Sequence, residues 1–161
     1  MGHSTNLKFL NSNISELDVL YYEVLMLNKT ANFYPEEKNY IKKNSLLESF
    51  LIHARNLIDF LEDNRKNHDD STCSNFINIE QAKINPVIIK ISPRLKKKIN
   101  KNLSHMTTTR ISEKIDWADE ILSVKSEINN RLKIFLSCLS SKYFPTKRGM
   151  HIQSFLDLIN E

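Results

Sequence analysis

Glycine and proline are scarce in this chain. The sequence contains only two glycines and four prolines among its 161 residues. An all-β fold with many tight turns needs more of both, because these residues supply the backbone conformations that such turns require. Their scarcity predicts an all-α fold built from long helices.

Motifs for metal, nucleotide and redox chemistry are also missing. Cys73 and Cys138 are the only cysteines, and neither belongs to a CxxC pair, which argues against zinc-ribbon and thioredoxin-like sites. The sequence has no GxxxxGK(S/T), GxGxxG, GxSxG or HExxH motif, and no ExxH pair of the kind that di-iron bundles repeat. We therefore expect neither a metal site nor a cofactor.

Long apolar segments are absent as well. No segment approaches the roughly 20 apolar residues that span a bilayer, and no apolar run near the N-terminus precedes a small-residue cleavage site. These absences predict a cytoplasmic protein without a membrane partner.

What is present fits a single globular domain. Hydrophobic residues make up 40% of the chain and charged residues 26%, which is the ordinary range for globular proteins. We expect one helical-bundle domain over residues 1–161, with residues 1–14 disordered or partly derived from an affinity tag.

Helical periodicity defines the expected elements. Apolar residues recur every three to four positions in five segments: residues 16–32, 36–64, 93–107, 112–141 and the stretch from Ile152 to Ile159. Pro35 fits the first turn of the second helix, and Pro93 begins the third. Because Pro86 interrupts a β-like run, residues 76–92 are expected to be irregular, with a short helix near residues 72–78. The prediction is an all-α bundle of four to five main helices.

The clearest apolar periodicity lies in the fourth of these helices. Its members alternate between spacings of three and four, which is typical of a coiled-coil seam or a bundle core: Trp117, Ile121, Val124, Ile128, Leu132, Phe135 and Leu139. The spacing leaves open whether this seam faces the chain's own core or a second subunit.

One face of the predicted helix 93–107 is basic. Arg94, Lys98, Lys101 and His105 follow the spacing i, i+4, i+7, i+11 and therefore align. A histidine can act as a general base near neutral pH, and cations beside it can bind a phosphodiester. This face is thus a candidate for metal-independent RNA cleavage with His105 as the catalytic base. A lone helical histidine is more often structural, and a basic stretch is more often a solvated face.

Arg55 and the remaining histidines have competing interpretations. Arg55 can face His105 and bind an anion, or it can pair with Glu48 or Asp59, and the i, i+4 spacing to Asp59 favours the ion pair. Three further histidines have no partner at ligand spacing and are predicted to be solvated or packed: His53, His68 and His151.

Three segments of the sequence together carry a family resemblance: LLESFLIHARNLIDFL (46–61), DDSTCSNF (69–76) and INKNLSHMTTTRI (99–111). Together they resemble an uncharacterised bacterial branch of the HEPN superfamily, the higher-eukaryote and prokaryote nucleotide-binding domains, over about residues 36–140. The resemblance implies a helical bundle that often forms homodimers. It also implies metal-independent ribonuclease activity in toxin–antitoxin, abortive-infection or CRISPR systems, with an Arg-x(4–6)-His motif at the active site.

The chain departs from that motif at one position. His105 matches the motif histidine, whereas the residue five positions earlier is Asn100 instead of arginine. Lys101 or Arg55 can supply positive charge nearby, although lysine lacks the planar donor fork of arginine. The resemblance therefore favours the fold and the dimer over catalysis.

Three functional hypotheses follow. The leading one is a bacterial HEPN-like protein that acts as a dimeric interaction or binding module in a mobile-element or defence context, with an antitoxin-like protein as a further partner. The first alternative is a toxin-like, metal-independent endoribonuclease that uses His105. The second is non-catalytic binding of RNA or a nucleotide through helix 93–107, with these residues as phosphate contacts: Arg94, Lys98, Lys101 and Arg55.

Overall fold

A computed structural model describes residues 16–64, 66–104, 117–140, 143 and 152–161. Within these ranges the chain forms no strand, and its α-helices are α1 (Glu16–Phe33), α2 (Tyr40–Leu61), α3 (Pro93–Ser104), α5 (Trp117–Ser137) and α6 (Ile152–Asn160). The predicted all-α bundle is confirmed.

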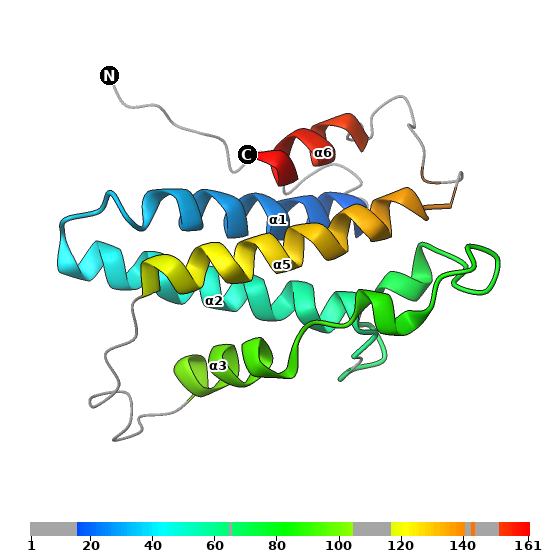
Figure 1. Cartoon of the computed structure of the whole chain (residues 1–161), viewed down its shortest axis with the longest axis horizontal. Helices are drawn as coiled ribbons and strands as arrows, with labels where there is room; N and C mark the ends of the chain where they lie inside the picture. Colours follow the sequence, from blue (N-terminus) through cyan, green and yellow to red (C-terminus); the bar gives the residue numbers. More distant parts are fainter. Residues whose placement is uncertain (1–15, 65, 105–116, 141–142, 144–151) are drawn as a thin grey trace.

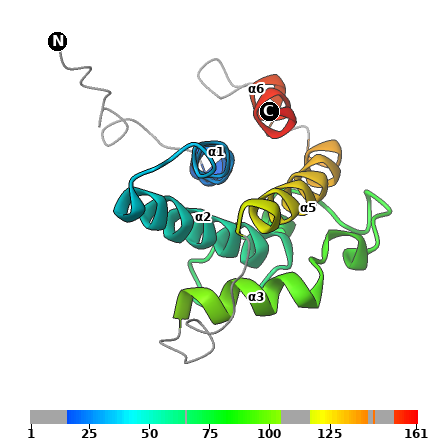
Figure 2. The same cartoon turned by 60° about the vertical axis from the view of Figure 1, so that its left-hand side comes forward.

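The three longest helices form the body of the bundle (Figure 1). α1 and α2 are joined by a short turn and pack against each other, and α5 contacts both of them. α6 contacts α1 and α5, whereas α3 contacts α2. Figure 2 shows the result: α3 and α6 lie at opposite ends of the stack, with α1, α2 and α5 between them.

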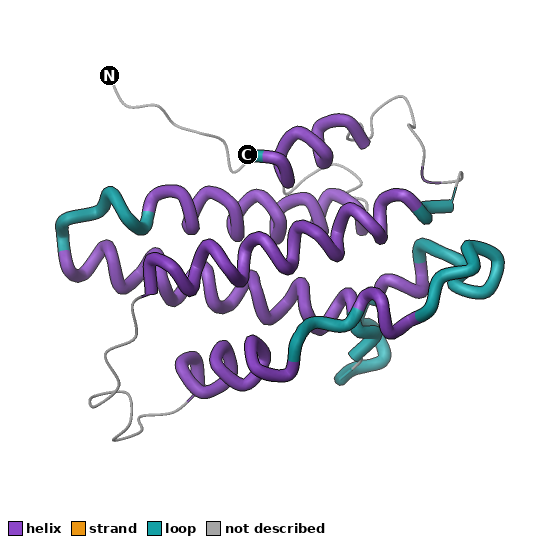
Figure 3. Tube along the Cα trace, viewed as in Figure 1, coloured by secondary structure: helices purple, strands orange, loops and turns teal. Residues whose placement is uncertain are grey.

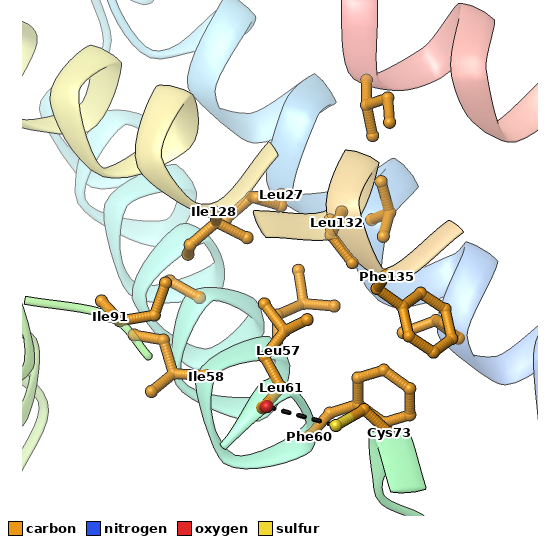
Figure 4. Packing of buried hydrophobic residues seen from close by; sticks show 14 of the residues in the cluster. Leu27, Leu57, Ile58, Phe60, Leu61, Cys73, Ile91, Ile128, Leu132 and Phe135 are labelled. Atoms are coloured by element: carbon orange, nitrogen blue, oxygen red, sulfur yellow. Dashed lines mark hydrogen bonds between the residues drawn. The ribbon is translucent and has the colours of Figure 1, made fainter. Parts of the chain in front are cut away.

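The apolar seam of α5 faces the chain's own core. Ile128, Leu132 and Phe135 are fully buried, and all three belong to the cluster that includes residues from every described α-helix. Figure 4 shows Leu132 and Phe135 pointing toward Leu57 and Phe60 of α2. The question that spacing left open is therefore settled in favour of the internal core.

The second helix begins later than predicted. Pro35 lies in the turn after α1, and the helix starts at Tyr40 because the side chain of Asn39 accepts a hydrogen bond from the backbone N–H of Lys42 at 3.1 Å. Such a cap satisfies one of the N–H groups that the first turn leaves unpaired. The helix also ends earlier, at Leu61, with Asp63 two residues later in the left-handed region at φ 53°.

Residues 62–64 and 66–92 form an irregular connection, which includes the stretch 76–92 that was predicted to be irregular (Figure 3). It contains two 3₁₀ turns, η2 (Cys73–Asn75), within the predicted short helix, and η3 (Pro86–Ile89). Two carboxylates fix its far end: Glu62 accepts the backbone N–H of Ile91 at 2.9 Å, and Glu127 accepts that of Ser92 at 2.7 Å. These contacts position the start of α3.

One polar pair sits inside the core between α1 and α5. Asn129 donates to the side-chain oxygen of Asn28 at 2.9 Å and also lies 3.3 Å from the carbonyl oxygen of Ile159 in α6. Because an unpaired buried amide is unfavourable, this pairing favours one register of α5 against α1. Nearby, Lys125 donates to Asn32 at 2.8 Å, and burial lowers the pKa of its amino group.

Candidate functional site

The basic helix α3 packs on α2 through its apolar side. Leu95 and Ile99 are buried, and the backbone N–H of Lys96 bonds to the carbonyl oxygen of Ser92 at 3.2 Å as the helix begins. The opposite side carries Arg94 and Lys97, which are exposed. The predicted helix 93–107 is thus present as far as Ser104, and His105 lies outside the described residues.

Several cations of α3 are engaged within the chain. Lys98 forms an ion pair with Glu120 of α5, and Lys96 pairs at 2.8 Å with Glu62, the residue that follows α2. One carboxylate lies in α5 and the other directly after α2, so these pairs help to hold α3 against both helices. They also reduce the positive charge that this helix offers to an anionic ligand.

A hollow of about 180 Å³ lies between α2 and α3, and its lining includes Arg55, Lys96 and Asn100. The Nε of Arg55 is 4.0 Å from a carboxylate oxygen of Asp59, the ion pair that sequence spacing favoured. Asp59 is also bound by Lys66 and by Asn64, whose amide donates at 2.8 Å. The guanidinium of Arg55 is therefore only weakly bound by Asp59, and it retains N–H donors for another acceptor.

The four predicted anion contacts do not gather in one place. Arg55 lines the α2–α3 hollow, whereas Lys98 turns toward α5. Arg94 is exposed elsewhere on α3, and Lys101 is half-buried. The hollow instead includes Lys96 and Asn100, which the sequence did not single out as ligand contacts.

A second cluster, which sequence spacing missed, lies between α1 and α2. The Nδ1 of His53 is 2.7 Å from a carboxylate oxygen of Glu23, and Asn56 donates to the same oxygen at 3.1 Å. His53 is buried, and the ring of Tyr22 stands edge-on to it at 5.6 Å. His68 is exposed, and His151 lies outside the described residues.

Two hollows follow the groove between α1 and α2, one on each side of this cluster. The first has a volume of about 430 Å³, an apolar floor of Leu20, Leu57 and Phe60, and a rim with four carboxylates and one ammonium: Glu16, Glu23, Asp59, Asp70 and Lys66. We call it the acidic hollow. The second has a volume of about 560 Å³, and its lining includes Met26, Phe33 and Ile41. We call it the apolar hollow.

Large apolar side chains are exposed along the same groove. Their exposed fractions run from 49% for Ile52 to 75% for Ile41, and the set is Val19, Tyr22, Phe33, Ile41 and Ile52. Figure 2 shows α5 and α6 on the other side of α1, and no described element covers this side of the helix pair. We call this surface, with its two hollows, the α1–α2 face.

Cys73 is unsuited to nucleophilic chemistry. Burial, reinforced by the negative charge of Asp63, raises the pKa of its thiol to about 12. The thiol donates to the carbonyl oxygen of Leu61 at 3.3 Å, the contact drawn in Figure 4. A thiol with such a pKa stays protonated near neutral pH, and the thiolate is the reactive form.

Comparisons with known proteins supply no relative: no family model, curated protein or solved structure matches this chain. In the part of the chain that the structure describes, no three histidine, cysteine, aspartate or glutamate side chains gather as metal ligands. No described helix has both the length and the apolar composition needed to cross a membrane. The α1–α2 face and the α2–α3 hollow are the candidate binding surfaces for the functions proposed below.

Proposed function

We propose that this chain is a HEPN-like binding module that pairs with a second copy of itself through the α1–α2 face, in a bacterial mobile-element or defence context. The observation that carries the proposal is the row of exposed apolar side chains on that face. Monomeric proteins rarely expose contiguous apolar surface of this kind, and such patches mark interaction sites.

The dimensions of the face support this proposal. α1 has 18 residues and α2 has 22. At 1.5 Å per residue and about 10 Å per helix, the pair presents a surface of roughly 600 Å². A standard interface buries about 800 Å² per partner, so this face would supply most of what a stable dimer needs.

Sedimentation velocity with two matched variants tests this function. Ile52 is 49% exposed on the α1–α2 face, and Ile88 is 43% exposed in η3, away from that face. We expect the native chain to be dimeric at micromolar concentration and Ile52→Glu to weaken the dimer about a hundredfold, since a buried charge without a partner is highly unfavourable. Ile88→Glu should dimerise normally. A monomeric native chain, or equal behaviour of the two variants, contradicts the proposal.

A second candidate function is binding of RNA or a nucleotide phosphate at the α2–α3 hollow. Its support is Arg55, whose side chain is 42% exposed and whose ion pair with Asp59 is long at 4.0 Å. An arginine can hold a phosphate through two parallel N–H donors, and Asn100 in the same hollow offers another donor.

Fluorescence anisotropy with a labelled single-stranded RNA tests this second candidate. We expect affinity to fall steeply with salt as phosphate contacts release counterions, and Arg55→Gln to weaken binding about tenfold. Lys133→Gln, which removes the charge of an exposed lysine on α5 outside the hollow, is the matched control. Equal losses in both variants argue against the hollow. Cleavage of the RNA in EDTA that His105→Ala abolishes would instead support the endoribonuclease hypothesis.

A further inference from the structure

A further hollow lies where α6 packs on α5, on the side of α1 that is away from the α1–α2 face (Figure 2). We call it the α5–α6 hollow. Its volume is about 260 Å³, and its lining includes Leu122, Lys125, Asn129, Lys133, Ile159 and Glu161. The side-chain amide of Asn129 lies 3.3 Å from the carbonyl oxygen of Ile159 and so ties the end of α6 to α5. The hollow is therefore formed by the packing of the bundle.

Lys125 places a buried cation in this hollow. Its side chain belongs to a residue that is only 9% exposed, and its ammonium donates to the amide oxygen of Asn32 at 2.8 Å. Burial lowers the pKa of this ammonium, the carboxylate of Glu161 partly opposes that effect, and the ammonium of Lys29 adds to it. A neutral amide oxygen does not balance a buried charge, so an anion placed beside Lys125 would stabilise it.

Glu161 indicates which anion these side chains accept. Its carboxylate is held by Lys29 of α1 at 2.7 Å, and the two side chains are 44% and 43% exposed. The same carboxylate acts on the charge of Lys125, yet among the described residues no carboxylate forms an ion pair with Lys125. The group of lysines thus already holds one carboxylate and leaves its most buried ammonium without one.

Apolar side chains lie beside this cation. Leu122 and Ile159 line the same hollow, and Leu122 is 53% exposed. An apolar wall next to an ammonium is complementary to a ligand with a carboxylate at one end and a short hydrocarbon chain at the other. Pockets for drug-sized ligands have volumes of roughly 300–1,000 Å³, so the α5–α6 hollow admits only a small molecule.

We propose that the α5–α6 hollow binds a small aliphatic carboxylate, whose oxygens accept hydrogen bonds from the ammonium of Lys125 and whose chain contacts Leu122 and Ile159. Ser126 and Asn130 also line the hollow and are exposed, so they offer neutral donors beside the ammonium. This site shares no lining residue with the two hollows of the α1–α2 face, and its test is therefore independent of the proposed dimer.

Titration with butyrate, followed by ¹H–¹⁵N NMR of the amides around the hollow, tests this site. We expect saturable shifts in the native chain. Lys125→Met should weaken binding about tenfold, since methionine removes the charge and suits a buried position. Glu161→Gln should instead strengthen binding about threefold, because it removes a competing carboxylate and releases Lys29. Acetate should bind about tenfold more weakly than butyrate, because it lacks two methylene groups that the apolar wall would cover.

Lys97→Met is the matched control, since Lys97 is exposed on α3, at the opposite end of the stack from α6 (Figure 2). Equal butyrate affinity in Lys125→Met and Lys97→Met overturns the site, and so do shifts that do not saturate in the native chain. Acetate that binds as tightly as butyrate contradicts the apolar contact. Glu161 is exposed, so Glu161→Gln keeps the test decisive even if circular dichroism shows that Lys125→Met does not fold. A Glu161→Gln variant that binds butyrate no more tightly than the native chain also overturns the proposal.

Discussion

Asp70 closes the polar turn after α2. Its carboxylate accepts the backbone N–H groups of Lys66 and Asn67 at 2.7 and 2.8 Å. These bonds, first that of Asn67 and then that of Lys66, favour the charged form and lower the pKa of Asp70 below its ordinary value of 3.8. A lowered pKa in the folded state means that the ionised carboxylate stabilises the fold above pH 3.8 and that this contribution disappears as the pH falls through the folded-state pKa.

Asp70→Asn should therefore lower the melting temperature near neutral pH, and the difference from the native chain should shrink as the pH drops below 3.8. Asparagine keeps an acceptor oxygen but loses the charge that strengthens both backbone bonds. Thermal unfolding, followed by circular dichroism at pH values from neutral to below 3.8, measures the effect. Asp69→Asn is the control, because Asp69 is exposed and its contact is with His68. A difference that stays constant with pH would refute this account.

Spacing in the sequence could not predict those contacts of the candidate surfaces that join residues far apart in the chain. Glu23 is 30 positions from His53, so their 2.7 Å contact depends on how α1 and α2 pack and has no signature at ligand spacing. His53 sits between buried Leu51 and Ala54 in α2, which was the one local sign that it is packed. By contrast, the pair of Arg55 and Asp59 was predictable because i, i+4 geometry within one helix needs no tertiary information.

At the scale of elements, apolar periodicity identified the helices better than their ends. The seam of α5 was evident because one apolar side chain per turn must face a core, and its members Ile121 and Leu132 are indeed buried. The predicted start of α2 was wrong because Pro35 and Asn39 both suit the beginning of a helix. The structure uses Asn39, whose side chain caps the first turn, rather than Pro35, whose backbone is only preorganised for it.

The basic face of α3 shows a related limit. Spacing within α3 correctly placed Arg94, Lys98 and Lys101 on one helix, but it contains no information about the carboxylates that surround that helix. Glu120 is 22 positions from Lys98, and Glu62 is 34 positions from Lys96. A basic stripe read from one element therefore overstates the charge that remains available to a ligand.

At the scale of the whole molecule, Phe76 joins the irregular connection to the bundle. Its ring is 5.7 Å from that of Phe60, 6.1 Å from that of Phe135 and 5.0 Å from that of Tyr143. Its carbonyl oxygen accepts the backbone N–H of Ser140 at 3.1 Å. Phe76 thus links α2, the end of α5 and the segment that positions α3, and it is almost completely buried.

Phe76→Ala should lower the free energy of unfolding by about 3–5 kcal/mol, because it removes a buried ring and leaves a cavity among three other rings. Tyr143→Phe is the matched control: it keeps the ring and removes the hydrogen bond that the hydroxyl donates to the carbonyl oxygen of Asn75, at about 0.5–1.5 kcal/mol. Urea unfolding measures both values. If Phe76→Ala is no more destabilising than Tyr143→Phe, the aromatic cluster does not hold the connection to the bundle.

If the cluster does hold it, hydrogen exchange in Phe76→Ala should rise first in residues 73–92, while the amides of α5 stay protected.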